Sequence, residues 1–297
     1  MIKKFTYSLF VTLAFSFALS SASSAATQQS SAKSSETHIL DLNARENFSW
    51  TTAPWTGDER PYSAARAAVD SAALRPGFDD YVNGCAVAAQ QRPSDAKLAF
   101  TWAYAVWVAG LQKKSGGALN DMVEAIWWIP ARDDITNTYD GARIRFLYEA
   151  CNSPTPSPLL IPLGIRLLKH SKDDFSVQLG LASLYISEVY RVKTGGRDLL
   201  IRSMTLFREA EALEPDSPMP YGGISKDYEM ESSYCDGWNW NAGAKMTTRS
   251  QRDLETSITY LEQDIARTTP SDPWHEYLIR RLNNFHSVIE RYGSNQR

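Results

Sequence analysis

Residues 174–196, DFSVQLGLASLYISEVYRVKTGG, decide the fold because they repeat an earlier stretch of the chain. Residues 95–117, DAKLAFTWAYAVWVAGLQKKSGG, align with them without a gap. Each copy opens on an aspartate and closes on Lys-x-Gly-Gly, and apolar residues in between recur every three to four positions, which predicts a helix. Glycine suits the left-handed conformation in which many helices end. The pattern therefore predicts helix, glycine-containing turn and helix, used twice. The glycines lack the GxxxxGK[ST] order of a phosphate-binding loop.

The rest of the chain also has the helical period. From Tyr62 onward apolar residues recur at intervals of three and four, and no convincing alternating strand is found, so the chain is predicted to be all-α. Residues 152–162, NSPTPSPLLIP, contain prolines that forbid a continuous helix. We therefore expect a helical domain over residues 61–297, built from duplicated halves of about 61–151 and 158–297 that this segment links.

One junction resembles the tetratricopeptide repeat (TPR) family. Residues 203–229, SMTLFREAEALEPDSPMPYGGISKDYE, have small, aromatic and small residues followed by a closing proline, and then the start of another helix. The positions that match are Ser203, Phe207, Ala210 and Pro215, then Tyr221, Ile224, Ser225 and Tyr228. A similar layout follows Tyr81, with Cys85, Ala88 and Pro93. The resemblance implies an α-solenoid of antiparallel helix pairs in a right-handed superhelix.

The repeats are irregular. Family units run to about 34 residues, whereas the junctions at Ser171, Pro215 and Pro270 are more widely and unevenly spaced. Residues 258–278 also have Glu262 where the family usually has an aromatic residue. The resemblance covers roughly residues 62–292, and a different solenoid of helical pairs remains an alternative.

The N-terminus indicates export. Residues 1–26 contain Lys3 and Lys4, an apolar run from Phe5 to Leu19, and small residues that suit a cleavage site, as in a secretory signal peptide. Removing this segment changes the formal charge from −3 to −5, which argues against a nucleic-acid partner. No later stretch is long and apolar enough to span a membrane, so we expect a periplasmic or secreted protein. Residues 27–60 are predicted to be disordered or extended.

Three cysteines allow one disulfide at most. Export permits disulfides, and Cys151 and Cys235 both lie beside turn-rich segments, so they are the candidate pair. Cys85 lies on an apolar helical face and is expected to be a buried thiol.

The family resemblance implies that a protein or peptide segment binds in a concave groove. Gln178, Lys226 and Glu229 fall near positions of the first helices that commonly face this groove in the family. They are the candidate ligand-binding residues of the repeats, and an ordinary solvated helix face is the alternative.

A second candidate site is the insertion SSYCDGWNWNAGAK, residues 232–245. Loops on a rigid scaffold often carry function. If the backbone is extended, Trp238 and Trp240 face one side and the two asparagines that follow them face the other. Exposed indoles beside amides suit a sugar ring or a peptide, whereas indoles that fold back onto the helices would only pin the loop. Trp102 and Trp107 are predicted to be core residues.

The sequence contains no convincing catalytic or metal-binding motif. The four histidines are scattered, and HEYLI at His275 has Ile279 where a zinc protease needs its second histidine. Asp133, Asp134, Glu231 and Asp236 lie near aromatic residues, but their spacing singles out no acid pair of the kind that helical glycosidases use. We therefore expect an interaction module or scaffold without enzymatic activity, metal or cofactor. The alternative is a glycan-binding or glycan-cleaving helical protein that uses the insertion.

Overall fold

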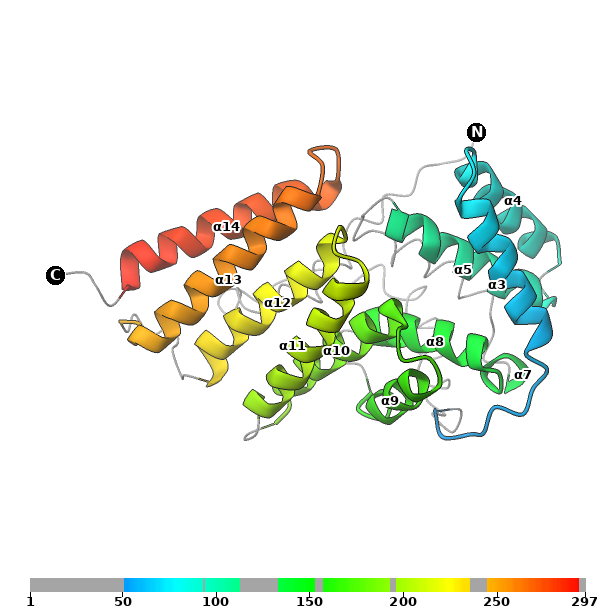
Figure 1. The fold of residues 1–297 in the computed structure, drawn as a ribbon, viewed down its shortest axis with the longest axis horizontal. Helices are drawn as coiled ribbons and strands as arrows, with labels where there is room; N and C mark the ends of the chain where they lie inside the picture. The colour runs from blue at the N-terminus through cyan, green and yellow to red at the C-terminus, as the bar shows by residue number, and fades with distance from the viewer. Residues whose placement is uncertain are drawn as a thin grey trace, which may run out of the picture.

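The computed structural model describes residues 51–92, 94–112, 133–152, 157–192, 196–235 and 245–293. Over these residues the protein is all-α, with no strand, as the apolar spacing predicted. Helices α3, α4, α5 and α7 lie at one end of the molecule, and from α8 to α14 the helices follow one another towards the other end (Figure 1). They are α3 (Arg60–Ala73), α4 (Phe78–Gln91), α5 (Ala96–Gln112), α7 (Asp133–Thr136), α8 (Tyr139–Asn152), α9 (Leu160–His170), α10 (Phe175–Val189), α11 (Gly196–Leu213), α12 (Pro218–Met230), the π-helical turn η2 (Glu231–Cys235), α13 (Thr248–Arg267) and α14 (Pro273–Tyr292).

The two copies of the duplicated stretch form α5 and α10, and both helices begin in the same way. Asp95 accepts hydrogen bonds from the backbone N–H groups of Lys97 (3.1 Å) and Leu98 (3.3 Å). Asp174 accepts one from the N–H of Val177 (3.1 Å). A carboxylate at this position satisfies N–H groups that have no partner inside the helix. The aspartate that opens each copy is therefore a helix cap.

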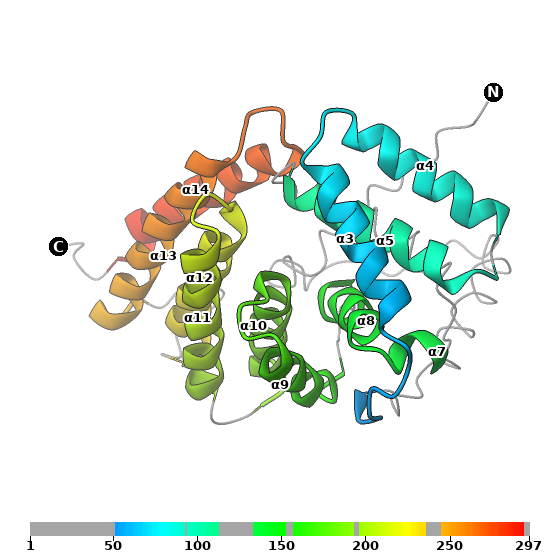
Figure 2. The same ribbon diagram turned by 45° about the vertical axis from the view of Figure 1, so that its right-hand side comes forward.

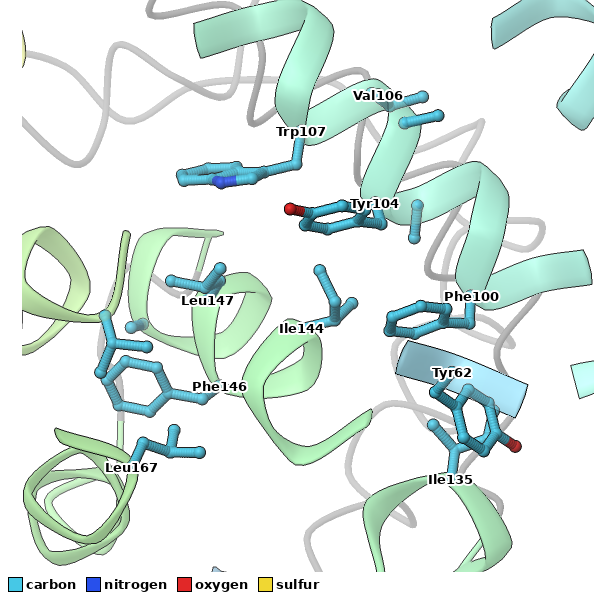
Figure 3. Packing of buried hydrophobic residues seen from close by; sticks show 14 of the residues in the cluster. Tyr62, Phe100, Tyr104, Val106, Trp107, Ile135, Ile144, Phe146, Leu147 and Leu167 are labelled. Carbon is cyan, nitrogen blue, oxygen red and sulfur yellow. The ribbon is translucent and has the colours of Figure 1, made fainter. Parts of the chain in front are cut away.

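Helices α5 and α10 lie at the centre of the largest apolar cluster. Trp102 and Trp107 are 5% and 1% exposed, which confirms that both are core residues. Figure 3 shows Trp107 and Phe100 reaching from α5 towards α8. The indole N–H of Trp107 donates to the hydroxyl of Ser176 in α10 (2.8 Å), so this hydrogen bond joins the two duplicated helices directly.

A buried ion pair joins α8 to the start of α10. The guanidinium of Arg143 donates from both Nε and Nη2 to the carboxylate of Asp174, the Nη2 bond being 2.9 Å long. The hydroxyl of Tyr139 donates to the same carboxylate (3.2 Å). Burial alone would raise the pKa of Asp174, but Arg143 outweighs it and lowers the pKa. The cap of α10 thus also fixes the position of α8.

Residues 51–59 follow an irregular path against α8 and α9. The Glu59 carboxylate accepts hydrogen bonds from the backbone N–H groups of Tyr139 (2.7 Å) and Asp140 (2.9 Å) at the start of α8. The guanidinium of Arg166 in α9 lies 4.3 Å above the ring of Trp55 and donates to the carbonyl of Ala53 (2.9 Å). This part of the predicted disordered or extended segment is held by specific contacts.

Consecutive helices pack against one another through the second half of the chain. Helix α10 contacts α8, α9, α11 and α12, and α12 contacts α10, α11 and α13. Figure 2, which is turned by 45° from Figure 1, shows a curved row of helices from α8 through α10 and α12 to α13 and α14. A second apolar cluster lies between α10, α11 and α12, and a third lies between α13 and α14.

Phe146 of α8 occupies a space that two glycines leave open. It is fully buried, and an added Cβ at Gly164 in α9 or at Gly180 in α10 would lie 2.9 Å from a carbon of its ring. Figure 3 shows Phe146 close to Leu167 of α9. The small residues therefore let three helices approach around a single aromatic ring.

We expect Gly164→Ala and Gly180→Ala each to lower the free energy of unfolding by about 1–3 kcal/mol, because the added methyl group overpacks the core. Gly84→Ala is the matched control, since Gly84 lies inside α4 with no atom within 4 Å of an added Cβ. That change should stabilise by roughly 0.5–1 kcal/mol, the ordinary gain of alanine in a helix. Denaturant unfolding measures both, and the same sign at all three glycines would contradict this packing.

Candidate functional site

Two of the predicted ligand-binding residues, Lys226 and Glu229, meet a third charged residue from a distant part of the chain. The ammonium of Lys226 donates to one oxygen of the Glu229 carboxylate (2.9 Å). The guanidinium of Arg281, in α14, donates to the other oxygen (2.6 Å). All three side chains are about nine-tenths buried. One carboxylate is therefore shared by two cations.

The two cations keep Glu229 ionised despite its burial. Burial alone would raise the pKa of Glu229, but the positive charges and hydrogen bonds of Lys226 and Arg281 outweigh it and lower the pKa to about 2. Ionised and buried groups are costly unless they are paired. The salt bridges thus connect α12 to α14 at a place where apolar packing alone does not join them.

A pair of exposed tyrosines lies beside these charges. Tyr190 follows α10 and Tyr234 lies in η2, and their rings meet edge to face with centroids 4.9 Å apart. Desolvation raises the pKa of Tyr190 to about 12, and the negative charge of Glu229 adds to this increase. The pKa of Tyr234 is also raised, chiefly by desolvation. The charge of Glu229 adds to this increase and that of Lys226 opposes it. We call these five residues, Tyr190, Lys226, Glu229, Tyr234 and Arg281, the tyrosine–charge cluster.

The π-helical turn η2 positions Tyr234. The hydroxyl of Ser232 is buried and donates to the carbonyl of Ser250 in α13 (2.8 Å). Cys235 packs against the apolar cluster of Val189, Leu200 and Met230. With residues on both sides anchored, Tyr234 remains 55% exposed and its partner Tyr190 47% exposed. π-Helical turns are rare and are often found at functional sites.

Asp227, next to the cluster on α12, is buried without compensation. It is fully buried, and neither oxygen of its carboxyl group has a hydrogen-bond partner. The nearby hydroxyl of Ser203 donates instead to the carbonyl of Ala182 (3.1 Å). Burial raises the pKa of Asp227 well above its ordinary value; Ser203 acts to lower this pKa and the charge of Glu231 acts to raise it. Burial without a hydrogen-bond partner therefore disfavours the ionised form of this acid.

A second buried acid, Asp264 of α13, lies against Gly222 of α12. An added Cβ at Gly222 would lie 2.7 Å from an Asp264 oxygen, so the glycine makes room for the carboxyl group. Burial raises the pKa of Asp264 to about 7, and Arg281 opposes that increase. Asp264 is therefore close enough to the cluster for its charge and that of Arg281 to interact.

The predicted site residues divide into three groups. Lys226 and Glu229 come together, as described above. Gln178 lies apart from them near the start of α10, where it is 2% exposed and donates to the carbonyl of Lys172 (3.2 Å), so it does not face a groove. Trp238 and Trp240 lie outside the described residues, and their role stays a prediction.

The predicted Cys151–Cys235 disulfide also stays a prediction, because the side chain of Cys151 lies outside the described part of the chain. Of the acids considered for glycan cleavage, Glu231 lies between Arg197 (3.1 Å) and Arg249 (3.4 Å). The side chains of Asp133 and Asp134, and all of Asp236, are outside the described residues.

Sequence reasoning missed three members of the cluster. Tyr190 precedes the Lys-x-Gly-Gly turn and Tyr234 lies inside the insertion already singled out, so their positions beside turns were a usable signal. Arg281 carried no such signal, because its partner Glu229 is 52 residues away in the chain.

Within the described residues, no group of three or more histidine, cysteine, aspartate or glutamate side chains could hold a metal ion. No helix in the same part of the chain combines the length and apolar character needed to cross a bilayer. No family model matches the chain, and neither a curated protein nor a solved structure is significantly similar to it.

We expect Glu229→Gln to lower the free energy of unfolding by about 3 kcal/mol at neutral pH, since the pKa of Glu229 falls from 4.5 to about 2 on folding. A lowered pKa stabilises the fold above the ordinary value, and this contribution disappears as the pH falls from about 4.5 towards 2. The difference between wild type and variant should therefore shrink in acid. Glu231→Gln is the control, because its arginine partners are more exposed. Equal losses at both positions would contradict the special role of Glu229.

We expect Asp227→Asn to stabilise the protein increasingly as the pH rises. Because the pKa of Asp227 is raised in the folded protein, the acid ionises more readily in the unfolded chain. The wild type therefore loses stability as the pH rises above the ordinary pKa of 3.8. The slope is at most about 1.4 kcal/mol per pH unit. Denaturant titrations at several pH values measure it, and a difference that does not depend on pH would show that Asp227 ionises normally.

Proposed function

We propose that this chain is an exported interaction module or scaffold that holds a peptide or protein segment against the face where α10, α12 and α14 contribute the tyrosine–charge cluster. Its helices form TPR-like antiparallel pairs that stack into a right-handed solenoid. The role is binding rather than catalysis, and the site of action is the periplasm or the extracellular medium. The proposal of export rests on residues 1–26.

The pattern of helix contacts supports the solenoid. Helices α8, α10 and α12 contact one another in turn, and α10 and α12 each contact the helix that follows them. This is the pattern expected when helical pairs stack, since one pair cannot bury its apolar face alone. The motif residues Ser203, Phe207 and Ala210 are all buried, which supports packing of α11 against its neighbours through these positions.

The composition of the cluster carries the proposal of binding. Its residues come from the end of α10, from α12 with η2, and from α14, so three separate helices of the row contribute to one cluster. Tyrosine and arginine are enriched among the residues that dominate protein interfaces. Two half-exposed aromatic rings beside preorganised charges offer both an apolar platform and directional hydrogen bonds.

Selection from a random peptide library on the purified mature protein tests this function. We expect enriched peptides whose Kd weakens about tenfold or more in Tyr190→Ala/Tyr234→Ala, since truncating a binding hot spot costs more than 1 kcal/mol. Leu74→Ala/Ile201→Ala is the control, because both side chains are more than half exposed. Leu74 directly follows α3, and Ile201 lies on α11. Circular dichroism checks that each variant is folded.

The proposal fails if no peptide is enriched, or if the control variant weakens binding as much as the tyrosine variant does. Retention of the protein on a glycan column that is lost in Trp238→Ala/Trp240→Ala would instead favour the glycan-binding alternative.

A further inference from the structure

The cations of the tyrosine–charge cluster have more hydrogen-bond donors than the cluster has acceptors. Lys226 and Arg281 each donate once, and both hydrogen bonds go to Glu229. An ammonium group has three N–H donors and a guanidinium group has five. Most of these donors therefore have no acceptor among the described residues, and the guanidinium nitrogens of Arg281 that lack one are not closed off from solvent.

The charge of the cluster is also unbalanced. Two cations share one carboxylate, which gives the cluster a net positive charge in a chain whose formal charge is −3. The other acid close to Arg281 is Asp264, whose raised pKa leaves it partly neutral near pH 7. Glu231, the next acid along the chain, is occupied by Arg197 and Arg249. No second fixed anion from these neighbours cancels the positive charge.

The carboxylate of Glu229 lies where the carboxylate of a ligand would accept hydrogen bonds from Lys226 and Arg281. It holds Lys226 and Arg281 together in the absence of a ligand, so the cost of burying and orienting both cations is already met by folding. The ring of Phe285 beneath Arg281, 5.1 Å from the guanidinium carbon, further restricts that side chain. A carboxylate from a ligand would meet preorganised donors and, beside them, the rings of Tyr190 and Tyr234.

We propose that the tyrosine–charge cluster binds an acidic peptide segment, with a carboxylate of the ligand accepting hydrogen bonds from Lys226 and Arg281 in competition with Glu229. This inference rests on the proposed function and specifies the chemistry of the ligand. The tyrosine rings contact the neighbouring residues of the segment. Glu229 acts as an internal competitor that weakens binding while it keeps the empty site folded.

Fluorescence polarisation with short labelled peptides tests the inference. One set contains aspartate and glutamate, and a matched set has asparagine and glutamine at the same positions. Each peptide is used with a free and with an amidated C-terminus, which distinguishes a side-chain carboxylate from the terminal one. We expect the acidic set to bind at least about tenfold more tightly than the amide set, because close charge pairs contribute strongly to affinity when they are desolvated.

Variants of the cluster should change affinity in opposite directions. Glu229→Gln removes the internal competitor and should tighten binding of the acidic peptides, whereas Lys226→Met and Arg281→Met should reduce it to the level of the amide set. Glu231→Gln is the matched control, because Glu231 also lies between two cations, but these are Arg197 and Arg249, which do not belong to the cluster. We expect no change in this control.

The pH dependence of the wild-type protein provides a test that needs no destabilised variant. The charges of Arg281 and Arg267 lower the pKa of Asp264 and that of Asp272 raises it. Asp264 becomes negative as the pH rises through about 7, so binding of acidic peptides should weaken between about pH 6 and pH 8. Asp264→Asn should remove this dependence. Titration of the wild-type protein therefore decides the matter even if Glu229→Gln does not fold.

The outcomes separate this inference from the proposed function. Equal binding of the acidic and amide sets, with binding still lost in Tyr190→Ala/Tyr234→Ala, would overturn the inference and leave a peptide-binding face. Equal effects of Glu229→Gln and Glu231→Gln would also overturn it. Failure to bind any peptide would overturn both proposals.

Discussion

Helix α10 is buried along almost its whole length, and the rest of the molecule depends on how its faces are covered. Leu181 and Leu184 belong to the large cluster formed with α3, α5, α8 and α9, whereas Leu179 and Ala182 belong to the cluster formed with α11 and α12. A helix that is apolar on all sides must be enclosed by other helices. Because α10 contributes to both cores, the helices before it and after it stabilise one another through it, and neither set buries its apolar surface alone.

The polar contacts follow from the same constraint. Where α10 begins inside the protein, its N–H groups need an acceptor, and Asp174 supplies one while pairing with Arg143. Further along the row, the charges of Lys226, Glu229 and Arg281 connect helices that apolar side chains do not join closely. Buried charges held by hydrogen bonds fix one arrangement of helices more strictly than apolar contacts do, because any shift would break these bonds. Rigid placement of charges is also what a binding site needs.

The sequence predicted those features that depend on neighbours along the chain. The apolar period predicted the helices, and the aspartates that open the two aligned stretches are helix caps. Gln178 was assigned to a groove by analogy with regular repeats, but α8 and α9 cover the start of α10 and the side chain bonds to the carbonyl of Lys172. Arg281 could not be found in this way, because its meeting with Glu229 depends on how α12 and α14 approach each other.

The insertion that begins at Ser232 shows how one short segment can have two roles. A connector between α12 and α13 needs only to be anchored. The hydrogen bond from Ser232 to Ser250 and the packing of Cys235 anchor its start. These two contacts alone would not require an aromatic residue between them. Tyr234 nevertheless lies there, half exposed and edge to face with Tyr190, beside a carboxylate that two buried cations share. Within the π-helical turn, Ser232 and Cys235 face the core and Tyr234 faces outward. The same local geometry therefore anchors the end of α12 against its neighbours and leaves the ring of Tyr234 half exposed beside Tyr190.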